Sequence, residues 1–189
     1  MSEFKGYSLW LAPSPSSPAY QHAGSLIKAL AARYATSRFD PHVTLLSPIK
    51  ATPDEIRAAF DGIRRSIDPG LGGKRIVRIG IKEIVTKPLH YQCVVLHVGG
   101  DNLQPLYDAT ELAFYGKKTP YFSHLSLVYG DLSEETRREI ADYVERGEWF
   151  RDDTESDWRK ALSFEADRVL IVDTSGRPEE WSIKGEIPL

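Results

Sequence analysis

The sequence predicts an α/β (α+β) fold: a bilobal protein with duplicated β-α-β-α-β units, pseudo-two-fold symmetry, antiparallel-rich sheets flanking a central groove, and helices outside. The first observation is the order of elements, β-α-β-α-β followed by β-α-β-α-β-β, read from hydrophobic periodicity and helix caps. The second is a pair of histidine motifs of one design, one in each half. The third is spacing, because each motif lies at a similar distance from the strand before it and the cap after it. We infer a duplication from order and spacing, since residue identity between the halves is otherwise slight.

The first half, residues 1–88, is expected to hold three strands and two helices. Thr52 and Glu55 flank a proline in the pattern of a capping box, which predicts a helix start. A glycine-rich turn is expected at Pro69–Gly73. The strands are expected at Tyr7–Leu11, His42–Ser47 and about Arg75–Val85, and the helices at about Ala19–Ser37 and Pro53–Ile67.

The second half, residues 89–189, repeats this order and adds a strand. Ser133 is expected to cap a helix whose first turn carries two glutamates, and Asp101 or Asn102 to cap the helix before it. The strands are expected at about Tyr91–Val98, His124–Tyr129, Ala166–Asp173 and Trp181–Ile187, the last two as a hairpin, and the helices at about 102–114 and Glu134–Arg146. Residues 1–189 are therefore interpreted as a single two-lobed domain.

Composition narrows the classes of function. The formal net charge of −3 argues against a long nucleic-acid surface, which needs a basic stripe, but allows a small phosphorylated ligand. Cys93 is the only cysteine, so no intrachain disulfide can form, and it is expected in the core. No apolar run approaches the roughly 20 residues of a membrane span, and the first residues lack a signal-peptide run. We expect a cytoplasmic protein, with nuclear residence equally allowed, no membrane partner, and a monomer as the default.

The two motifs read His42-Val43-Thr44-Leu45 and His124-Leu125-Ser126-Leu127. Each pairs an imidazole with a hydroxyl two residues later. Because side chains of a strand alternate between its faces, the imidazole and the hydroxyl of each motif should point the same way, about 7 Å apart. Two such units facing one groove would present two imidazoles and two hydroxyl donors.

This set of groups suits a phosphodiester. Imidazole serves as acid and as base near neutrality, so one of His42 and His124 could take a proton from water while the other protonates the departing oxygen. Thr44 and Ser126 would hydrogen-bond the non-bridging phosphate oxygens. No metal and no cofactor are expected, because the sequence has no His-Glu-x-x-His helix, cysteine pair or carboxylate cluster.

Each assignment has a purely structural alternative. One His-x-Thr in a strand is usually structural, but two at equivalent places favour catalysis. Trp10 could fill the core or border the groove, and Tyr129 could line the site or simply pack. His22, His90 and His97 are expected outside the site. Gly70–Lys74 is rejected as a phosphate loop because its spacing is wrong and no Ser or Thr follows the lysine.

These residues resemble the two-histidine (2H) phosphoesterase superfamily, and within it the eukaryotic cyclic phosphodiesterases of plant and yeast type. The resemblance rests on Ser8-Leu9-Trp10, Gln92-Cys93-Val94 and His124-Leu125-Ser126-Leu127-Val128-Tyr129-Gly130, and covers nearly the whole chain. It implies hydrolysis of ADP-ribose 1″,2″-cyclic phosphate, a by-product of tRNA splicing, to ADP-ribose 1″-phosphate, and of nucleoside 2′,3′-cyclic phosphates to 2′-phosphates.

The resemblance also implies roles for single residues. His42 and His124 are implied as the catalytic pair, and Thr44, Ser126 and Tyr129 as phosphate ligands. The plant members have intramolecular disulfides, which a single cysteine excludes here.

Two other functions stay open: processing of RNA ends that carry a 2′,3′-cyclic phosphate, and nucleotide binding without turnover. The sequence does not decide which histidine is the base, although we favour His124 as the base and His42 as the acid. Tyr121 or Phe122, in the loop before His124, is hypothesised to stack on a nucleobase.

Overall fold

The computed structural model describes residues 6–67, 76–151 and 155–189. They form an eight-stranded sheet in the order β6-β3-β4-β5-β2-β1-β7-β8, in which every neighbouring pair is antiparallel. The expected glycine-rich turn and the rejected phosphate loop, at 69–74, lie outside the described residues.

The strands are β1 Tyr7–Leu11, β2 Val43–Ile49, β3 Val77–Thr86, β4 Val94–Gly99, β5 His124–Val128, β6 Phe164–Ala166, β7 Arg168–Asp173 and β8 Ser182–Pro188. The α-helices are α1 Pro18–Tyr34, α2 Pro53–Ile67, α3 Leu103–Tyr115, α4 Glu134–Arg146 and α5 Trp158–Leu162, and short 3₁₀ turns form at η1 His90–Gln92 and η2 Pro178–Glu180. The expected order of elements is confirmed except for the short helix α5, which was not expected, and β7 and β8 form the expected antiparallel hairpin. The strand expected at 166–173 is interrupted at Asp167, which separates β6 from β7.

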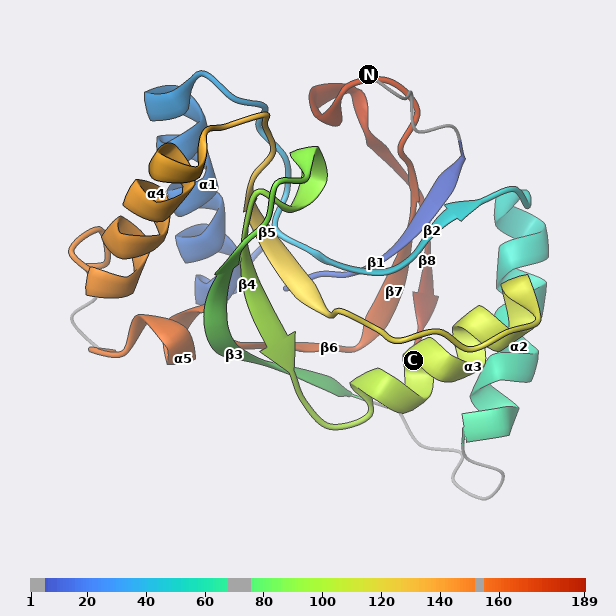
Figure 1. Cartoon of the computed structure of the whole chain (residues 1–189). Helices are drawn as coiled ribbons and strands as arrows, with labels where there is room; N and C mark the ends of the chain where they lie inside the picture. The colour runs from blue at the N-terminus through green and yellow to red at the C-terminus, as the bar shows by residue number, and fades with distance from the viewer. Residues whose placement is uncertain (1–5, 68–75, 152–154) are drawn as a thin grey trace.

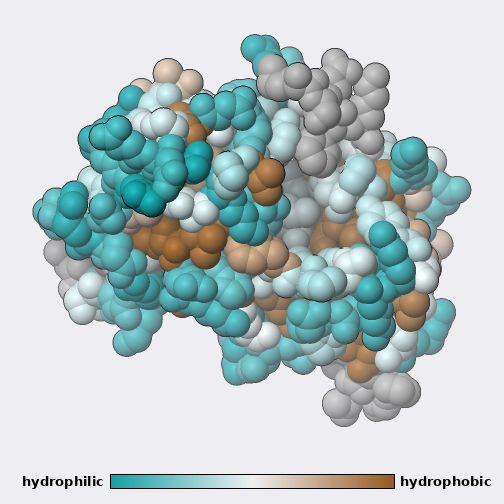
Figure 2. All heavy atoms as spheres, in the orientation of Figure 1, coloured by the Kyte–Doolittle hydropathy of each residue, from teal (hydrophilic) through white to brown (hydrophobic). Residues whose placement is uncertain are grey.

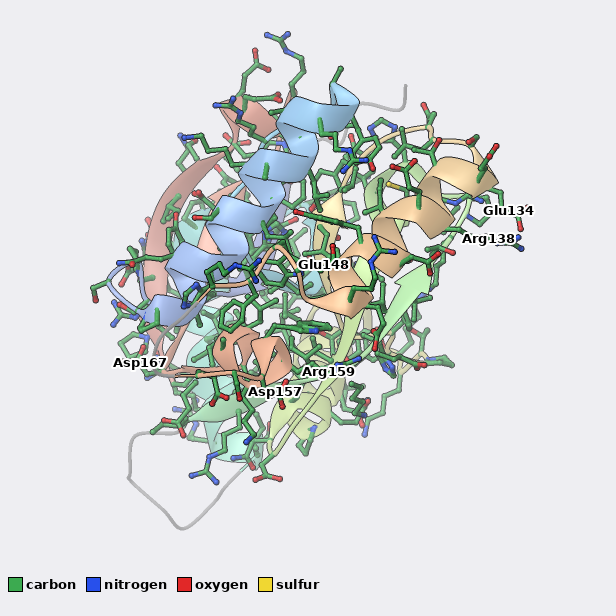
Figure 3. The ribbon with its side chains drawn as sticks, turned by 90° about the vertical axis from the view of Figure 1, so that its left-hand side faces the viewer. Glu134, Arg138, Glu148, Asp157, Arg159 and Asp167 are labelled. Carbon is green, nitrogen blue, oxygen red and sulfur yellow. The ribbon has the colours of Figure 1, made fainter. Side chains whose placement is uncertain are left out.

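The sheet is strongly curled, and its helices lie on the outside of the curl (Figure 1). Helices α1, α4 and α5 cover the part that contains β3, β4 and β5, while α2 and α3 lie together beyond β2 and β8. Figure 3 shows α1, α4 and α5 side by side over the sheet, with the Arg138 guanidinium beside the Glu134 carboxylate on the outer surface of α4. The expected architecture, with helices outside and a groove inside, is thus confirmed.

The two sides of the sheet do not coincide with residues 1–88 and 89–189. Strand β3 belongs to the first half of the chain, yet it pairs with β4 and β6. Strands β7 and β8 belong to the second half, yet β7 pairs with β1. The helices cross over as well, because α1 packs against β5 and α3 packs against β2. The halves are therefore interlocked, because β3 pairs with strands of the second half and β1 pairs with β7.

The centre of the sheet is the contact between β2 and β5. Val43 pairs with Leu125, and each residue directly follows its motif histidine. Both side chains are fully buried in the core. Because strand side chains alternate, the residues before and after them emerge on the other face of the sheet, inside the curl. An antiparallel pair centred here also sets His42 across from Ser126 and Thr44 across from His124.

Local helix signals are mostly confirmed. The backbone N–H of Thr52 donates to the Glu55 carboxylate (2.7 Å) and the Glu55 N–H donates to the Thr52 hydroxyl (3.3 Å), which is the expected capping box. The Ser133 hydroxyl accepts from the Thr136 N–H, as expected. Asn102 occupies the position before α3 but does not cap it, because its side-chain amide donates to the Ile76 carbonyl.

The structure also shows where the single cysteine lies and how apolar the described helices are. Cys93 is buried in the core, and its thiol donates to the Val128 carbonyl (3.0 Å). None of the described helices combines the length and the apolar character needed to cross a membrane.

Replacing Leu125 by alanine should lower the free energy of unfolding by about 2–5 kcal/mol, because it opens a cavity where the two histidine strands meet. Urea unfolding followed by circular dichroism measures the effect. Leu112→Ala is the matched control, since this leucine is 51% exposed and its loss should change stability by less than about 0.5 kcal/mol. Equal stabilities of the two variants would contradict a central packing role for Leu125.

Candidate active site

A cavity of about 200 Å³ lies on the inner face of the sheet, beside the contact of β2 and β5. In Figure 2 a hollow opens near the centre of the face that is shown, with hydrophilic and hydrophobic surface on both sides. The cavity is lined by Ser8, Trp10, His42, Thr44, Ser47, Tyr91, Gln92, His124, Ser126, Tyr129, Thr174 and Trp181. All six residues expected at the site from the sequence are therefore brought together in one cavity.

The two histidines are oriented in the same way. The Nδ1 of His42 lies 2.6 Å from the Asp40 carbonyl oxygen, and the Nδ1 of His124 lies 2.8 Å from the Phe122 carbonyl oxygen. A carbonyl can only accept, so each Nδ1 carries a proton and donates it. In each neutral ring the Nε2 is then left with its lone pair available for proton transfer. Each motif thus fixes its own tautomer through the carbonyl two residues earlier.

His42 is enclosed by aromatic rings. The Trp10 indole stacks on it with ring centroids 3.6 Å apart and planes 8° apart, and the Tyr129 hydroxyl lies 3.5 Å from its Nε2. The imidazole is only 4% exposed. Burial lowers the pKa of His42 from 6.5 to about 4, and the nearby His124 also lowers it. The hydrogen bond to the Asp40 carbonyl acts in the opposite direction and raises this pKa. His42 is consequently neutral at pH 7 in the free protein.

His124 has a more open and more cationic neighbourhood. Its ring stacks on Phe122, with the ring centroids 5.2 Å apart. The Lys87 ammonium lies over the Phe122 ring, 3.2 Å from its centroid. Burial lowers the pKa of His124, and the charges of Lys87 and His97 lower it further, while the hydrogen bond to Phe122 raises it. His124 is only partly buried.

The hydroxyl groups form two sets along the cavity wall. Ser126, buried on β5, donates to the Tyr91 carbonyl at 3.2 Å, and Thr44 faces the cavity from β2. A second set was not anticipated from the sequence: the Ser8 hydroxyl donates to Ser47 (2.5 Å) and lies 3.4 Å from the Thr174 hydroxyl. These three come from β1, β2 and the end of β7, and only the order of strands in the sheet brings them together.

Trp10 and Tyr129 were each expected either to pack in the protein interior or to line the site. Both residues do both: they are buried against other side chains and they line the cavity. Trp10 is 5% exposed and forms one face of the His42 site. Tyr129 stacks on Phe39 at 3.8 Å and turns its hydroxyl toward His42. Burial raises the pKa of Tyr129, so its hydroxyl stays protonated and remains a hydrogen-bond donor.

The packing of Tyr121 and Phe122 argues against the stacking hypothesis. The Tyr121 ring stacks on Tyr107 at 3.9 Å, and its hydroxyl donates to the Thr44 carbonyl at 2.8 Å, so it holds β2 in place. Phe122 lies between His97 and His124. Neither lines the cavity. Both rings are occupied by protein neighbours, which a loop position in the sequence could not reveal.

The aromatic side chains that do line the cavity, besides Trp10 and Tyr129, are Tyr91 and Trp181. Their ring centroids are 6.3 Å apart. Tyr91 lies in the η1 turn, where a strand was expected, and Trp181 was expected only as the start of the last strand. Proximity to the Gln92-Cys93 segment could have indicated Tyr91, but no sequence signal distinguishes Trp181.

The other three histidines, His22, His90 and His97, do not line the cavity, as expected. His90 contacts the Asp131 carboxylate (3.1 Å) and His97 contacts Glu83 (3.2 Å). Within 6–67, 76–151 and 155–189, no group of three or more His, Cys, Asp or Glu side chains is arranged as metal ligands.

Comparison with known proteins shows which family has this arrangement. The family model for cyclic phosphodiesterase-like proteins matches residues 5–189. The chain belongs to this family. The expected membership of the 2H phosphoesterases, with the hydrolase class that it carries, is thereby confirmed.

Two relatives illustrate the similarity. A cyclic phosphodiesterase of Arabidopsis thaliana is 29% identical over 140 residues, which cover 70% of this chain and 69% of the relative. The structure of Usb1 from Kluyveromyces marxianus superposes with a TM-score of 0.51 at 16% identity and covers 97% of both chains. The second comparison supports the fold alone.

The lowered pKa of His42 makes stability depend on pH. Between pH 6.5 and about 4 the unfolded chain binds a proton at this residue and the folded protein does not, so folding stability falls as the pH falls. His42 should contribute a loss of up to about 3 kcal/mol over this window. Urea unfolding at stepped pH should give a steeper dependence for the wild type than for His42→Asn. Identical slopes would show that His42 titrates normally.

Proposed function

We propose that this cyclic phosphodiesterase-like protein hydrolyses ADP-ribose 1″,2″-cyclic phosphate to ADP-ribose 1″-phosphate and nucleoside 2′,3′-cyclic phosphates to nucleoside 2′-phosphates, without a metal ion. The observation that carries the proposal is the pair of identically oriented imidazoles, His42 and His124, in one cavity with Thr44 and Ser126. Family membership, and a relative named as a cyclic phosphodiesterase, support the reaction class.

The phosphate is proposed to lie between the two motifs. Thr44 and Ser126 donate hydrogen bonds to its non-bridging oxygens, which gain charge as water adds to phosphorus. Tyr129 adds a donor next to His42. The oxygen of water bonds to phosphorus, the bond from phosphorus to one ribose oxygen breaks, and one histidine takes a proton from water while the other gives a proton to the ribose oxygen. Atoms and charge balance, because each histidine changes by one proton in opposite directions.

The surroundings of the two histidines suit one of them to act as the general base and the other as the general acid. Burial lowers the pKa of His42, which is only 4% exposed, to about 4, whereas His124 is only partly buried. A bound phosphate anion favours one proton on the pair, and the less buried ring carries the charge at a lower cost of desolvation. The Tyr129 hydroxyl beside the Nε2 of His42 also favours a neutral ring there. We therefore assign the base to His42 and the acid to His124, which reverses the assignment favoured from the sequence.

The size of the cavity fits a small substrate. A volume of about 200 Å³ holds a ribose cyclic phosphate rather than a whole dinucleotide. A neighbouring hollow of about 370 Å³ shares Trp181 with the cavity and is lined by Lys28, Arg38 and Phe39, together with the carboxylates of Asp40 and Glu179. It offers cations for a diphosphate and a ring for a base, which supports ADP-ribose cyclic phosphate as a substrate.

The biological setting is proposed from the same substrate. A protein that removes ADP-ribose cyclic phosphate would act in the metabolism of tRNA-splicing by-products, as a cytoplasmic monomer with a small nucleotide as its partner. The net charge of −3 supports a small ligand rather than long RNA.

Phosphorus NMR of an EDTA-treated sample tests the activity directly. The strained cyclic signal of ADP-ribose 1″,2″-cyclic phosphate or of a 2′,3′-cyclic nucleotide should disappear, and one monoester should appear, the 1″-phosphate or the 2′-phosphate. An oligonucleotide with a 2′,3′-cyclic end serves as the comparison and should react more slowly. A cyclic signal that persists in all three samples would contradict the proposal.

His42→Ala and His124→Ala should each lower kcat about 10²- to 10⁴-fold, because each removes a proton-transfer group. The same NMR assay measures the loss, and circular dichroism confirms that the fold is kept. His90→Ala is the matched control, since His90 lies outside the cavity, and should keep wild-type turnover. Near-wild-type rates in either cavity variant would rule out two-histidine catalysis.

A substrate with sulfur in place of the leaving ribose oxygen separates the two roles. Because a thiolate leaves without being protonated, His124→Ala should recover most of its lost rate with this substrate, and His42→Ala should not. Rescue of His42→Ala instead would restore the assignment favoured from the sequence.

A further inference from the structure

Trp181 carries a buried donor with no protein acceptor. Its Nε1 is shielded from solvent and makes no hydrogen bond to any described residue. Three other side-chain atoms share this state, on Thr36, Arg64 and Arg137, but none of these residues lines the catalytic cavity. By contrast, the Nε1 of Trp149 donates to the Val144 carbonyl at 3.1 Å. An unpaired buried donor is costly and points to a partner supplied by a ligand.

The Trp181 ring lies among the groups that surround the proposed phosphate. Its centroid is 5.7 Å from that of Trp10, 5.9 Å from Tyr129, 6.3 Å from Tyr91 and 6.5 Å from His42. Every one of these side chains lines the cavity. The indole therefore forms part of the cavity wall near His42.

The segment that carries Trp181 is tied to the strand ends around the site. Its own backbone N–H donates to the Pro178 carbonyl (3.4 Å), and the Glu179 carboxylate accepts from the Arg38 N–H (3.1 Å). At the other end of the connection, the Thr174 N–H donates to the Gly6 carbonyl (3.2 Å). These contacts restrain the backbone of the connection that carries Trp181.

The chemistry of the cavity selects the acceptor. Hydrogen bonds to charged oxygens are stronger than those between neutral groups, and a cyclic phosphodiester carries its charge on two non-bridging oxygens. We propose that the Nε1–H of Trp181 donates to a non-bridging phosphate oxygen of the substrate, as a third donor beside Thr44 and Ser126. This inference rests on the proposed function. On this proposal Trp181 is a catalytic residue, and its indole N–H stabilises the charge on the oxygens of the five-coordinate phosphorus.

Trp181→Phe tests the donor, because it keeps a packed ring and removes the N–H. It should lower kcat/KM roughly ten- to a hundredfold, the value of a hydrogen bond to a charged group. Most of the loss should appear in kcat, since the charge on the oxygens grows toward the transition state. Trp149→Phe is the matched control: it also removes an indole N–H, but one outside the cavity, and should keep wild-type kinetics.

Proton–nitrogen NMR of the four tryptophan indoles gives a readout that is independent of turnover. The Trp181 resonance is assigned by its loss in Trp181→Phe. Addition of inorganic phosphate, and separately of a nucleoside 2′-phosphate, should move its proton downfield and slow its exchange with solvent, while the Trp149 resonance stays in place. A purely packing role for the ring would leave the Trp181 proton unmoved.

The outcomes separate this inference from the proposed function. If the wild type cleaves cyclic phosphates and Trp181→Phe does so at the same rate, the inference is overturned and the proposed function stands. If the wild type cleaves none of them, the proposed function fails, and the phosphate titration alone decides whether Trp181 binds an anion. A downfield shift then supports the anion contact, and an unmoved resonance overturns it.

Discussion

The pairing of Val43 with Leu125 is the constraint on which the rest of the site depends. Both side chains are buried in the core, so the residues on either side of each must face the inside of the curled sheet. One antiparallel contact thereby sets two imidazoles and two hydroxyls around a common space. Two short motifs far apart in sequence therefore line the same cavity.

Protonation at the site follows from burial and from the tautomer that each motif fixes. The Asp40 and Phe122 carbonyls hold the two Nδ1 protons, so the Nε2 atoms are left to exchange protons with a ligand. Desolvation lowers both histidine pKa values, that of His42 to about 4. In the proposed mechanism an anionic substrate favours a proton on the pair of histidines, and the different burial of the two rings separates base from acid.

Aromatic side chains control access to this chemistry. Trp10 and Tyr129 line the cavity beside the motif residues. Tyr91 lies in the 3₁₀ turn η1, and Trp181 lies in the connection before β8. They line the cavity together with the motif residues, and Trp181 also lines the neighbouring hollow. The size of the cavity is thus set in part by segments outside the two motifs.

The sequence by itself determined the order of elements, the helix caps at Thr52 and Ser133, and the four motif residues, because these depend on local periodicity and on side chains within a few positions of one another. It placed Trp10 and Tyr129 at the site only as alternatives. Tertiary structure decided that β2 pairs with β5, that β7 pairs with β1, and that Ser8, Ser47, Thr174 and Trp181 meet at the cavity. It also decided that Tyr121 packs on Tyr107 rather than on a ligand. These outcomes depend on strand pairing and ring packing between distant segments, whose partners are selected by the surface that each covers and not by any local pattern.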